Sequence, residues 1–225
     1  IHPAMERGVF DIYPEYTGTG WNMVLKEDAQ YSEDMFPLLM ETYRERFRMR
    51  WLGMYGFNDT FGIVVRRDIA EQYHLQTYSD LQRAASVLVF GAEYDFFERE
   101  DGYTALCKAY GLSFARTMDM DIGLKYQAFA RSEVDVMTVF TTDGQLAAAD
   151  AVMLVDDRQF FPSYRCGNVV REEILAVHPE LTETLEKLTG IISDAEMAKM
   201  NYAVETNGED PHAVAEAFLR TKGVL

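Results

Sequence analysis

Apolar positions along the chain follow two alternating spacings, which predicts strands and helices in alternation. The run Phe61–Val65 (FGIVV) is bounded by polar residues and is typical of a buried strand. Segments of the same character are 87–90, 134–139 and 151–155. After Ser32, apolar residues recur at helical spacing at Met35, Leu38, Leu39, Tyr43 and Phe47. This alternation predicts an α/β architecture with largely parallel sheets flanked by helices.

Capping patterns mark where further helices begin. Thr77–Asp80 predicts the start of a helix that runs to Ala85, and Ser193–Glu196 is a capping box. Asp210 followed by Pro211 predicts another helix start. Met118–Ala130, in the middle of the chain, is also expected to be helical. After residue 170 the chain is expected to be mostly helical.

Two segments repeat each other at a constant offset. AMERGVFDIYPEYTGTG, residues 4–20, matches AFARSEVDVMTVFTTDG, residues 128–144, at alanine, arginine, aspartate, threonine and glycine positions. In each, a helix end leads into a strand that finishes on an aromatic residue, Tyr16 or Phe140. Ligands of open α/β sheets bind beyond the carboxyl ends of strands, so two similar lobes would present these rings to a ligand. Alternatively, the two segments are unrelated α/β turns that share common residues.

The charge of the chain narrows its partners. It contains 37 acidic and 21 basic residues, for a formal net charge of −16. Such a surface repels phosphate backbones, which argues against nucleic acid as a partner, and suits cationic ligands. The four histidines and two cysteines show no metal-ligand spacing, so no cofactor or metal is expected. No apolar run would cross a bilayer and no segment is typical of a signal peptide.

Several motifs occur in a fixed order that resembles a known family. They are YPEYTGTG, FNDTFGIVVRRD, FFEREDGY, MDMDIGLKY, FTTDG and FFPSY. Together they resemble the extracytoplasmic substrate-binding proteins of ABC importers for glycine betaine, carnitine, choline and related quaternary ammonium compounds. The resemblance covers essentially the whole chain. It implies a two-lobed periplasmic-binding-protein fold of type II that closes about a hinge around its ligand and carries out no chemistry on it.

The resemblance also implies a box of aromatic rings around a trimethylammonium group. Carried over position by position, the ligand-binding residues are Tyr16, Thr19, Phe61, Arg99, Phe140 and Tyr164, with Asn58 and Asp59 as secondary contacts. Arg99 would bind a ligand carboxylate. Phe61 and Phe140 stand where the family has tyrosines; a phenylalanine keeps the π face that attracts a cation, worth roughly 0.5–2 kcal/mol. Without the resemblance, these rings would be interpreted as core aromatics and Arg99 as a paired surface charge.

The chain departs from the family pattern in three places. Asp59 replaces an asparagine, and Arg165-Cys166-Gly167 replaces a small neutral segment. The family's first strand–helix–strand unit has no counterpart before YPEYTGTG, so we expect a longer native protein and an exposed sheet edge in the lobe that contains Tyr16. Cys166 is expected to be exposed, Cys107 to be a small buried residue, and the two cysteines to remain unbridged.

The chain path of the family predicts two lobes, one formed by residues 1–52 and 155–225 and the other by residues 53–154. The implied function is the capture of a quaternary ammonium ligand for an ABC permease and its ATPase subunits, outside the cytoplasm. A sensor or non-transport binding module that uses the same cleft is the alternative. An α/β enzyme is disfavoured, because the chain has no nucleophile elbow, Cys–His pair or phosphate-binding glycine loop.

Overall fold

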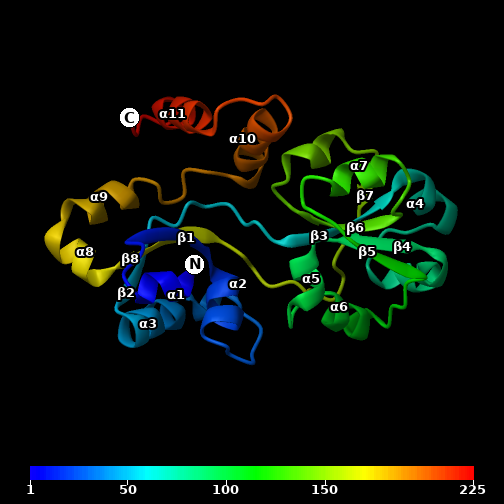
Figure 1. Ribbon diagram of the computed structural model, residues 1–225, viewed down its shortest axis with the longest axis horizontal. Coiled ribbons are helices and arrows are strands. Elements are labelled where there is room, and N and C mark those ends of the chain that lie inside the picture. The colour runs from blue at the N-terminus through cyan, green and yellow to red at the C-terminus, as the bar shows by residue number, and fades with distance from the viewer. The chain divides into compact units, whose positions relative to one another are not determined.

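The chain folds into two units that it crosses between twice (Figure 1). A computed structural model describes residues 1–225, apart from the side chain of residue 147. Unit 1 comprises Ile1–Thr60 and Pro162–Leu225, and unit 2 comprises Phe61–Phe161. The lobe boundaries expected from the sequence, after residues 52 and 154, fall earlier in the chain than these crossings.

Unit 1 contains an antiparallel sheet. Its described strands are β1 Ile12–Tyr16, β8 Cys166–Arg171 and β2 Met49–Leu52, in that order across the sheet. Its α-helices are α1 His2–Glu6, α2 Thr17–Thr19, α3 Phe36–Phe47, α8 Glu172–Val177, α9 Glu180–Glu186, α10 Asp194–Glu205 and α11 Pro211–Thr221. A π-helical turn, Gly20–Val24, and a 3₁₀ turn, Glu33–Met35, complete its helical segments.

The expectation of a largely parallel sheet is wrong for unit 1. Both β1 and β2 pair antiparallel with β8, with Tyr16 opposite Cys166 and Leu52 opposite Asn168. The chain leaves unit 1 shortly after β2 and returns shortly before β8. β2 and β8 therefore run in opposite directions. The whole of unit 2 connects them, in place of the short turn that usually joins an antiparallel pair.

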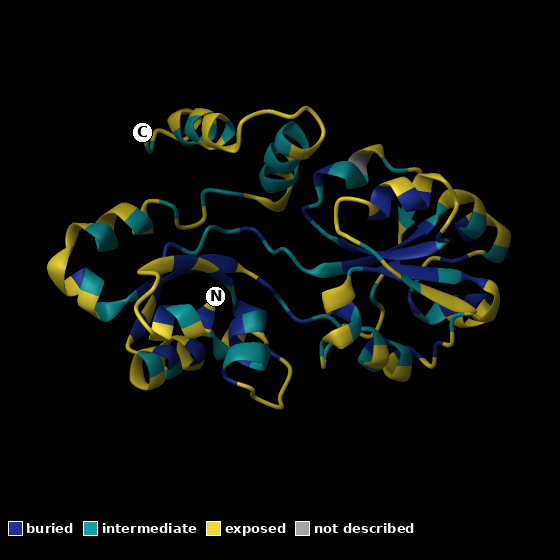
Figure 2. Cartoon of the chain, viewed as in Figure 1, coloured by how far each residue is buried: buried dark blue, intermediate teal, exposed yellow. Residues whose placement is uncertain are grey.

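Aromatic residues make up half of the main buried cluster of unit 1. Tyr43 is fully buried and its ring meets those of Phe47 and Trp51 edge to face, at centroid distances of 5.3 Å each. Tyr13 and Trp21 belong to the same cluster. Figure 2 shows this core in the strands and the inner faces of the neighbouring helices. By contrast, no described residue of α10 or α11 is fully buried.

Unit 2 contains a mixed sheet. Its described strands lie in the order β5 Arg116–Asp119, β4 Val89–Ala92, β6 Val136–Phe140, β3 Phe61–Arg66 and β7 Ala151–Met153. Its α-helices are α4 Arg67–Tyr73, α5 Tyr94–Glu98, α6 Tyr103–Tyr110 and α7 Lys125–Ala130, with 3₁₀ turns at Ser79–Arg83, Ala85–Val87 and Gly144–Ala148. β4 runs parallel to β5 and β6, whereas β3 runs antiparallel to β6 and β7.

The other predicted elements can be compared one by one. The buried strand at Phe61, the capping box of Ser193 and the helix start at Asp210 are confirmed. The helix expected over Met118–Ala130 is wrong in its first part, where β5 forms and α7 begins only at Lys125. β5 is a largely exposed edge strand, so its polar residues have no burial pattern that would identify a strand.

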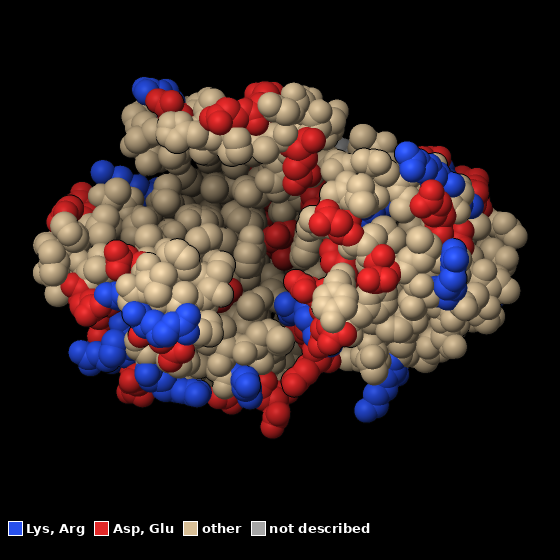
Figure 3. Space-filling view, in the orientation of Figure 1, with Lys and Arg blue, Asp and Glu red and all other residues tan. Residues whose placement is uncertain are grey.

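Acidic side chains are spread over the visible surface of both units (Figure 3). This matches the net charge of −16. Among the described residues, no helix combines the length and apolar character needed to span a bilayer.

Candidate functional site

Tyr16 is the last residue of β1. Hydrogen bonds between Thr17 and Arg165, the residues that follow Tyr16 and Tyr164, join the two segments. The three-residue helix α2 begins immediately after Tyr16. The Thr17 N–H donates to the Arg165 carbonyl at 3.0 Å, and the Arg165 N–H donates to the Thr17 hydroxyl at 3.1 Å. Thr17 is fully buried, so it holds the segment of Tyr164 against the end of β1. Thr19, at the end of α2, is half-buried.

Gly18 allows Tyr164 to approach this turn. A Cβ atom at Gly18 would lie 2.8 Å from the Ser163 carbonyl oxygen and 2.9 Å from the Tyr164 ring. These distances are shorter than real side-chain contacts, so a glycine is required here for close packing. The buried ring of Tyr164 therefore packs directly on the backbone that follows Tyr16.

Asn58 and Asp59, expected as secondary contacts, flank the backbone of Tyr164. The Asn58 side-chain oxygen accepts a hydrogen bond from the Tyr164 N–H at 2.7 Å. The Asp59 N–H donates to the Tyr164 carbonyl at 3.1 Å, and the Thr60 hydroxyl donates to the Pro162 carbonyl at 3.1 Å. The two chain crossings are thus hydrogen-bonded to each other on the unit 1 side, and Asn58 orients Tyr164.

A buried acidic environment surrounds the phenol of Tyr16. Burial is the main cause that raises the pKa of Tyr16 above its usual value, with smaller contributions from its neighbours Cys166 and Asp59. The Glu15 carboxylate is buried as well and accepts hydrogen bonds from the Tyr16 N–H at 2.8 Å and the Tyr13 hydroxyl at 2.9 Å. Tyr16 therefore remains a neutral phenol at physiological pH.

Cys166 faces Tyr16 across the sheet and is buried, so the expectation that it is exposed is wrong. Burial raises the pKa of the Cys166 thiol to about 12. Its burial follows from its position as the first residue of β8. Cys107 is half-buried, and neither cysteine is bridged.

The two phenylalanines expected in the box are neighbours in unit 2. Phe61 and Phe140 are paired residues of β3 and β6, and their ring centroids lie 4.9 Å apart. Phe96 and Phe161 extend this cluster, each with its centroid within 5.4 Å of that of Phe61. The antiparallel register places both box rings on one side of the sheet, because paired residues point the same way.

Arg99 lies over Phe61 but is already paired with a carboxylate. Its guanidinium carbon is 5.4 Å from the centroid of the Phe61 ring. Two hydrogen bonds of 2.7 Å each join it to Asp101. Arg99 is therefore a paired charge, as its sequence neighbours alone suggested, and it also lies beside one of the expected ligand-binding rings. A ligand carboxylate at Arg99 would bind in the presence of the Asp101 charge.

Each unit contains some of the expected residues, and contacts link most of those that share a unit. Unit 1 holds Tyr16, Thr19, Asn58, Asp59 and Tyr164, and unit 2 holds Phe61, Arg99 and Phe140. The sequence missed Gly18 as a packing requirement and the buried Lys125, whose ammonium lies 5.1 Å from the Phe140 ring centroid. A lone lysine at a helix start is usually solvated, so no sequence signal identified it.

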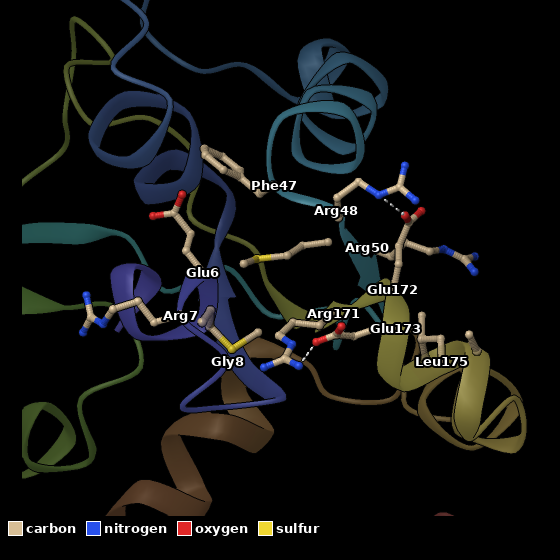
Figure 4. Close-up of a pocket in the computed structure, with 13 residues that line it drawn as sticks. Glu6, Arg7, Gly8, Phe47, Arg48, Arg50, Arg171, Glu172, Glu173 and Leu175 are labelled. Carbon is tan, nitrogen blue, oxygen red and sulfur yellow. Dashed lines mark ion pairs between the residues drawn. The ribbon is translucent and has the colours of Figure 1, made fainter.

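A separate cavity of about 950 Å³ lies in unit 1 (Figure 4). Its charged lining residues are Glu6, Arg7, Arg48, Arg50, Arg171, Glu172 and Glu173. Arg48 pairs with Glu172 at 3.3 Å, and Arg171 pairs with Glu173. None of the expected ligand-binding residues lines this cavity. Phe47 is the only aromatic residue in its described lining, so it has no aromatic box.

Comparisons with known proteins identify the family. The family model for the substrate binding domain of ABC-type glycine betaine transport systems matches residues 1–221. The chain belongs to this family. The expected resemblance is therefore confirmed across nearly the whole chain.

Family relatives with different names are similar to this chain. It is 42% identical to the ergothioneine transport permease/ergothioneine binding protein EgtU of Helicobacter pylori, over 100% of this chain and 40% of that protein. It is 38% identical to the carnitine transport binding protein OpuCC of Listeria monocytogenes, over 97% of this chain and 72% of that protein. The chain thus spans less than half the length of the Helicobacter relative.

A solved structure supports the fold. The crystal structure of a glycine betaine/carnitine/choline ABC transporter matches with a TM-score of 0.82 and 36% identity, covering 99% of this chain and 83% of that chain. The expected α/β periplasmic-binding-protein fold is confirmed by this match, with the correction to strand direction described above. No cluster of histidine, cysteine or acidic residues among the described residues is arranged to hold a metal ion.

Proposed function

We propose that this chain captures a quaternary ammonium compound for an ABC importer. Two observations together support the proposal. The chain belongs to the family, and aromatic residues stand at the ends of its strands: Tyr16 is the last residue of β1, and the neighbouring rings of Phe61 and Phe140 lie in unit 2. A trimethylammonium group is weakly hydrated, so aromatic faces can replace its water at little cost. Tyr164 would supply the fourth ring.

The relatives indicate the ligand class. Ergothioneine, carnitine and glycine betaine appear in the names of the similar proteins. All three compounds carry a trimethylammonium group and a carboxylate. Arg99 would bind the carboxylate through its planar guanidinium. A zwitterionic betaine is therefore the expected ligand, with choline, which has no carboxylate, as a weaker one.

In this proposal the chain acts outside the cytoplasm and delivers its ligand to a permease, which transmits the event to ATPase subunits. It carries out no reaction on the ligand. A sensor that uses the same residues would bind the same compounds. Transport of labelled betaine into vesicles that contain the complete system would separate importer from sensor, because only an importer moves the ligand.

Titration calorimetry tests the proposal directly. We expect the protein to bind at least one of glycine betaine, carnitine, ergothioneine and choline, and to bind N,N-dimethylglycine more weakly than glycine betaine because the protonated dimethylamine is more strongly hydrated. Replacing Arg99 with alanine should weaken glycine betaine binding by tenfold or more, about 1.4 kcal/mol, and choline binding much less.

Equal losses for the two ligands in the Arg99→Ala variant would show that Arg99 acts only through its contact with Phe61. The Arg67→Gln variant is the matched control, since Arg67 forms an exposed ion pair with Asp150 in the same unit. If no quaternary ammonium compound binds the wild-type protein, the proposed function is wrong.

A further inference from the structure

Lys125 is a buried cation held by two carboxylates in unit 2. Its side chain is 1% exposed. The ammonium lies 2.6 Å from the Glu93 carboxylate and 3.0 Å from the Asp143 carboxylate. The other Glu93 oxygen accepts a hydrogen bond from the Thr138 hydroxyl at 2.9 Å. Because a buried ion pair contributes little to stability by comparison with apolar packing of the same volume, stability alone does not account for this cluster.

The same cluster is in contact with Phe140. The Lys125 ammonium lies 5.1 Å from the centroid of the Phe140 ring, within cation–π range. The Asp143 carboxylate accepts hydrogen bonds from the Phe140 N–H at 3.0 Å and the Tyr126 hydroxyl at 2.9 Å. One cation and two carboxylates give the cluster a net charge of −1. This charge is close to the ring and is shielded from solvent.

We propose that the cluster of Lys125, Glu93 and Asp143 determines the preference of the Phe140 ring for cationic over zwitterionic ligands. The inference rests on the proposed function, in which an ammonium group binds at Phe140. A fixed net charge near the ring acts on the full charge of choline. In glycine betaine, the carboxylate of the same molecule cancels much of that effect. The net charge of the cluster therefore changes selectivity more than it changes betaine affinity.

A series of variants changes the cluster charge in single steps. Glu93→Gln gives a net charge of zero, Lys125→Met gives −2, and the double variant Lys125→Met/Glu93→Gln returns to −1. Glutamine preserves the shape of Glu93 and can still accept from Thr138. Thermal unfolding checks that each variant folds. Dissociation constants for choline and glycine betaine are measured by calorimetry, with competition titration where choline binds weakly.

We expect Glu93→Gln to lower the choline-to-betaine affinity ratio by roughly threefold to tenfold, since one charge about 10 Å away in a partly buried site acts on this scale. Lys125→Met should raise the ratio by a similar factor. The double variant should restore the wild-type ratio although two side chains have changed. Arg67→Gln, which removes a charge from an exposed pair in unit 2, should leave the ratio unchanged.

A purely structural role makes a different prediction. If the cluster only joins α7 to the segments that follow β4 and β6, the variants will weaken the binding of both ligands together and the ratio will stay constant. A constant ratio across Glu93→Gln and the double variant overturns the inference while leaving the proposed function intact. If the wild-type protein binds neither choline nor glycine betaine, the inference is overturned. The proposed function is overturned with it only if carnitine and ergothioneine do not bind either.

Discussion

At the scale of single residues, the environment of Tyr16 shows how a neutral aromatic face is preserved beside acidic groups. The buried carboxylate of Glu15 and the nearby charge of Asp59 favour a cation in this region, and they also favour the protonated phenol. The phenol of Tyr16 therefore stays neutral even in alkaline buffer, so a cation would meet the same ring over a wide pH range.

Replacing Tyr16 with alanine should weaken binding of a quaternary ammonium ligand by roughly tenfold or more, because one cation–π wall is lost. Tyr16→Phe keeps the ring and loses only the hydroxyl near Cys166, so its affinity should stay within about threefold of wild type. Calorimetry with glycine betaine measures both. Alanine and phenylalanine variants with equal affinity would contradict a role for the ring.

Residue positions were partly predictable. The aromatic residues could be selected from the sequence because each lies within a recognisable motif, such as YPEYTGTG for Tyr16. The burial of Lys125 and Cys166 could not be predicted, because it depends on segments from other parts of the chain that pack against them. Glu93 lies 32 positions before Lys125 in the sequence, and no local pattern connects them.

At the scale of elements, the turn after β1 depends on a glycine. Gly18→Ala should displace the Tyr164 ring or the Ser163 carbonyl, since the new Cβ would lie within 3 Å of both. We expect ligand affinity to fall severalfold while the protein remains folded. Gly20→Ala is the matched control, because its Cβ would meet the core residues Trp51 and Tyr43 at 3.0 Å instead of Tyr164.

The two glycine variants separate site geometry from stability. Gly20→Ala should lower the unfolding temperature with little change in affinity of the folded protein, and Gly18→Ala should do the reverse. Thermal unfolding and calorimetry on the same samples test this. Unchanged affinity in Gly18→Ala would show that Tyr164 is not held in place through this turn.

The N-terminus of α10 should be sensitive to acid. Hydrogen bonds from Lys222 and from the Ser193 backbone and hydroxyl lower the pKa of Glu196 from 4.5 to about 2. A depressed carboxylate pKa stabilises the folded state above pH 4.5, and this contribution is lost as the pH falls toward 2. Amide protection factors in α10 should therefore decrease between pH 4.5 and pH 2.

The Glu196→Gln variant should have weaker protection in α10 at neutral pH and a smaller further loss on acidification. Glu183→Gln, in the first turn of α9, is the control and should behave like wild type. The same acid-induced loss in wild type and Glu196→Gln would show that another group controls this helix end.

Elements were predictable where their signal is local. The capping box at Ser193 and the buried strand at Phe61 each depend on a few adjacent residues. β5 was missed because only Met118 is even partly covered in this edge strand. Strand direction in unit 1 was missed because it depends on the path of the chain through unit 2, which no single segment records.

At the scale of the whole molecule, the proposed ligand residues are divided between two units. Tyr16 and Tyr164 belong to unit 1, and Phe61 and Phe140 belong to unit 2. The internal repeat predicted this division, since each copy of the helix–strand pattern lies in a different unit: α1 and β1 in one, and α7 and β6 in the other. Under the proposed function, residues of both units bind one ligand, and that ligand would hold the units in one arrangement.

Ligand should therefore narrow the distribution of distances between the two units. Spin labels at Val177→Cys in unit 1 and Val87→Cys in unit 2 would report it, since these side chains are 71% and 62% exposed. Cys107 would be replaced with serine, whereas Cys166, a buried thiol with a pKa of about 12, would remain unlabelled at neutral pH. Pulsed electron–electron double resonance should then give a single narrow distance distribution at saturating glycine betaine and a broader distribution without it.

Two controls make the measurement specific to closure around the aromatic residues. A label pair within unit 2, at Val87→Cys and Ile122→Cys, should give the same distance with and without ligand, because both positions belong to one unit. The Tyr16→Ala variant should keep the broad inter-unit distribution at a ligand concentration that narrows that of wild type, and should narrow only when the concentration is raised in proportion to its weaker affinity. An inter-unit distribution that does not change at saturating ligand would show that the ligand binds within one unit, and that the rings of the other unit belong to its core.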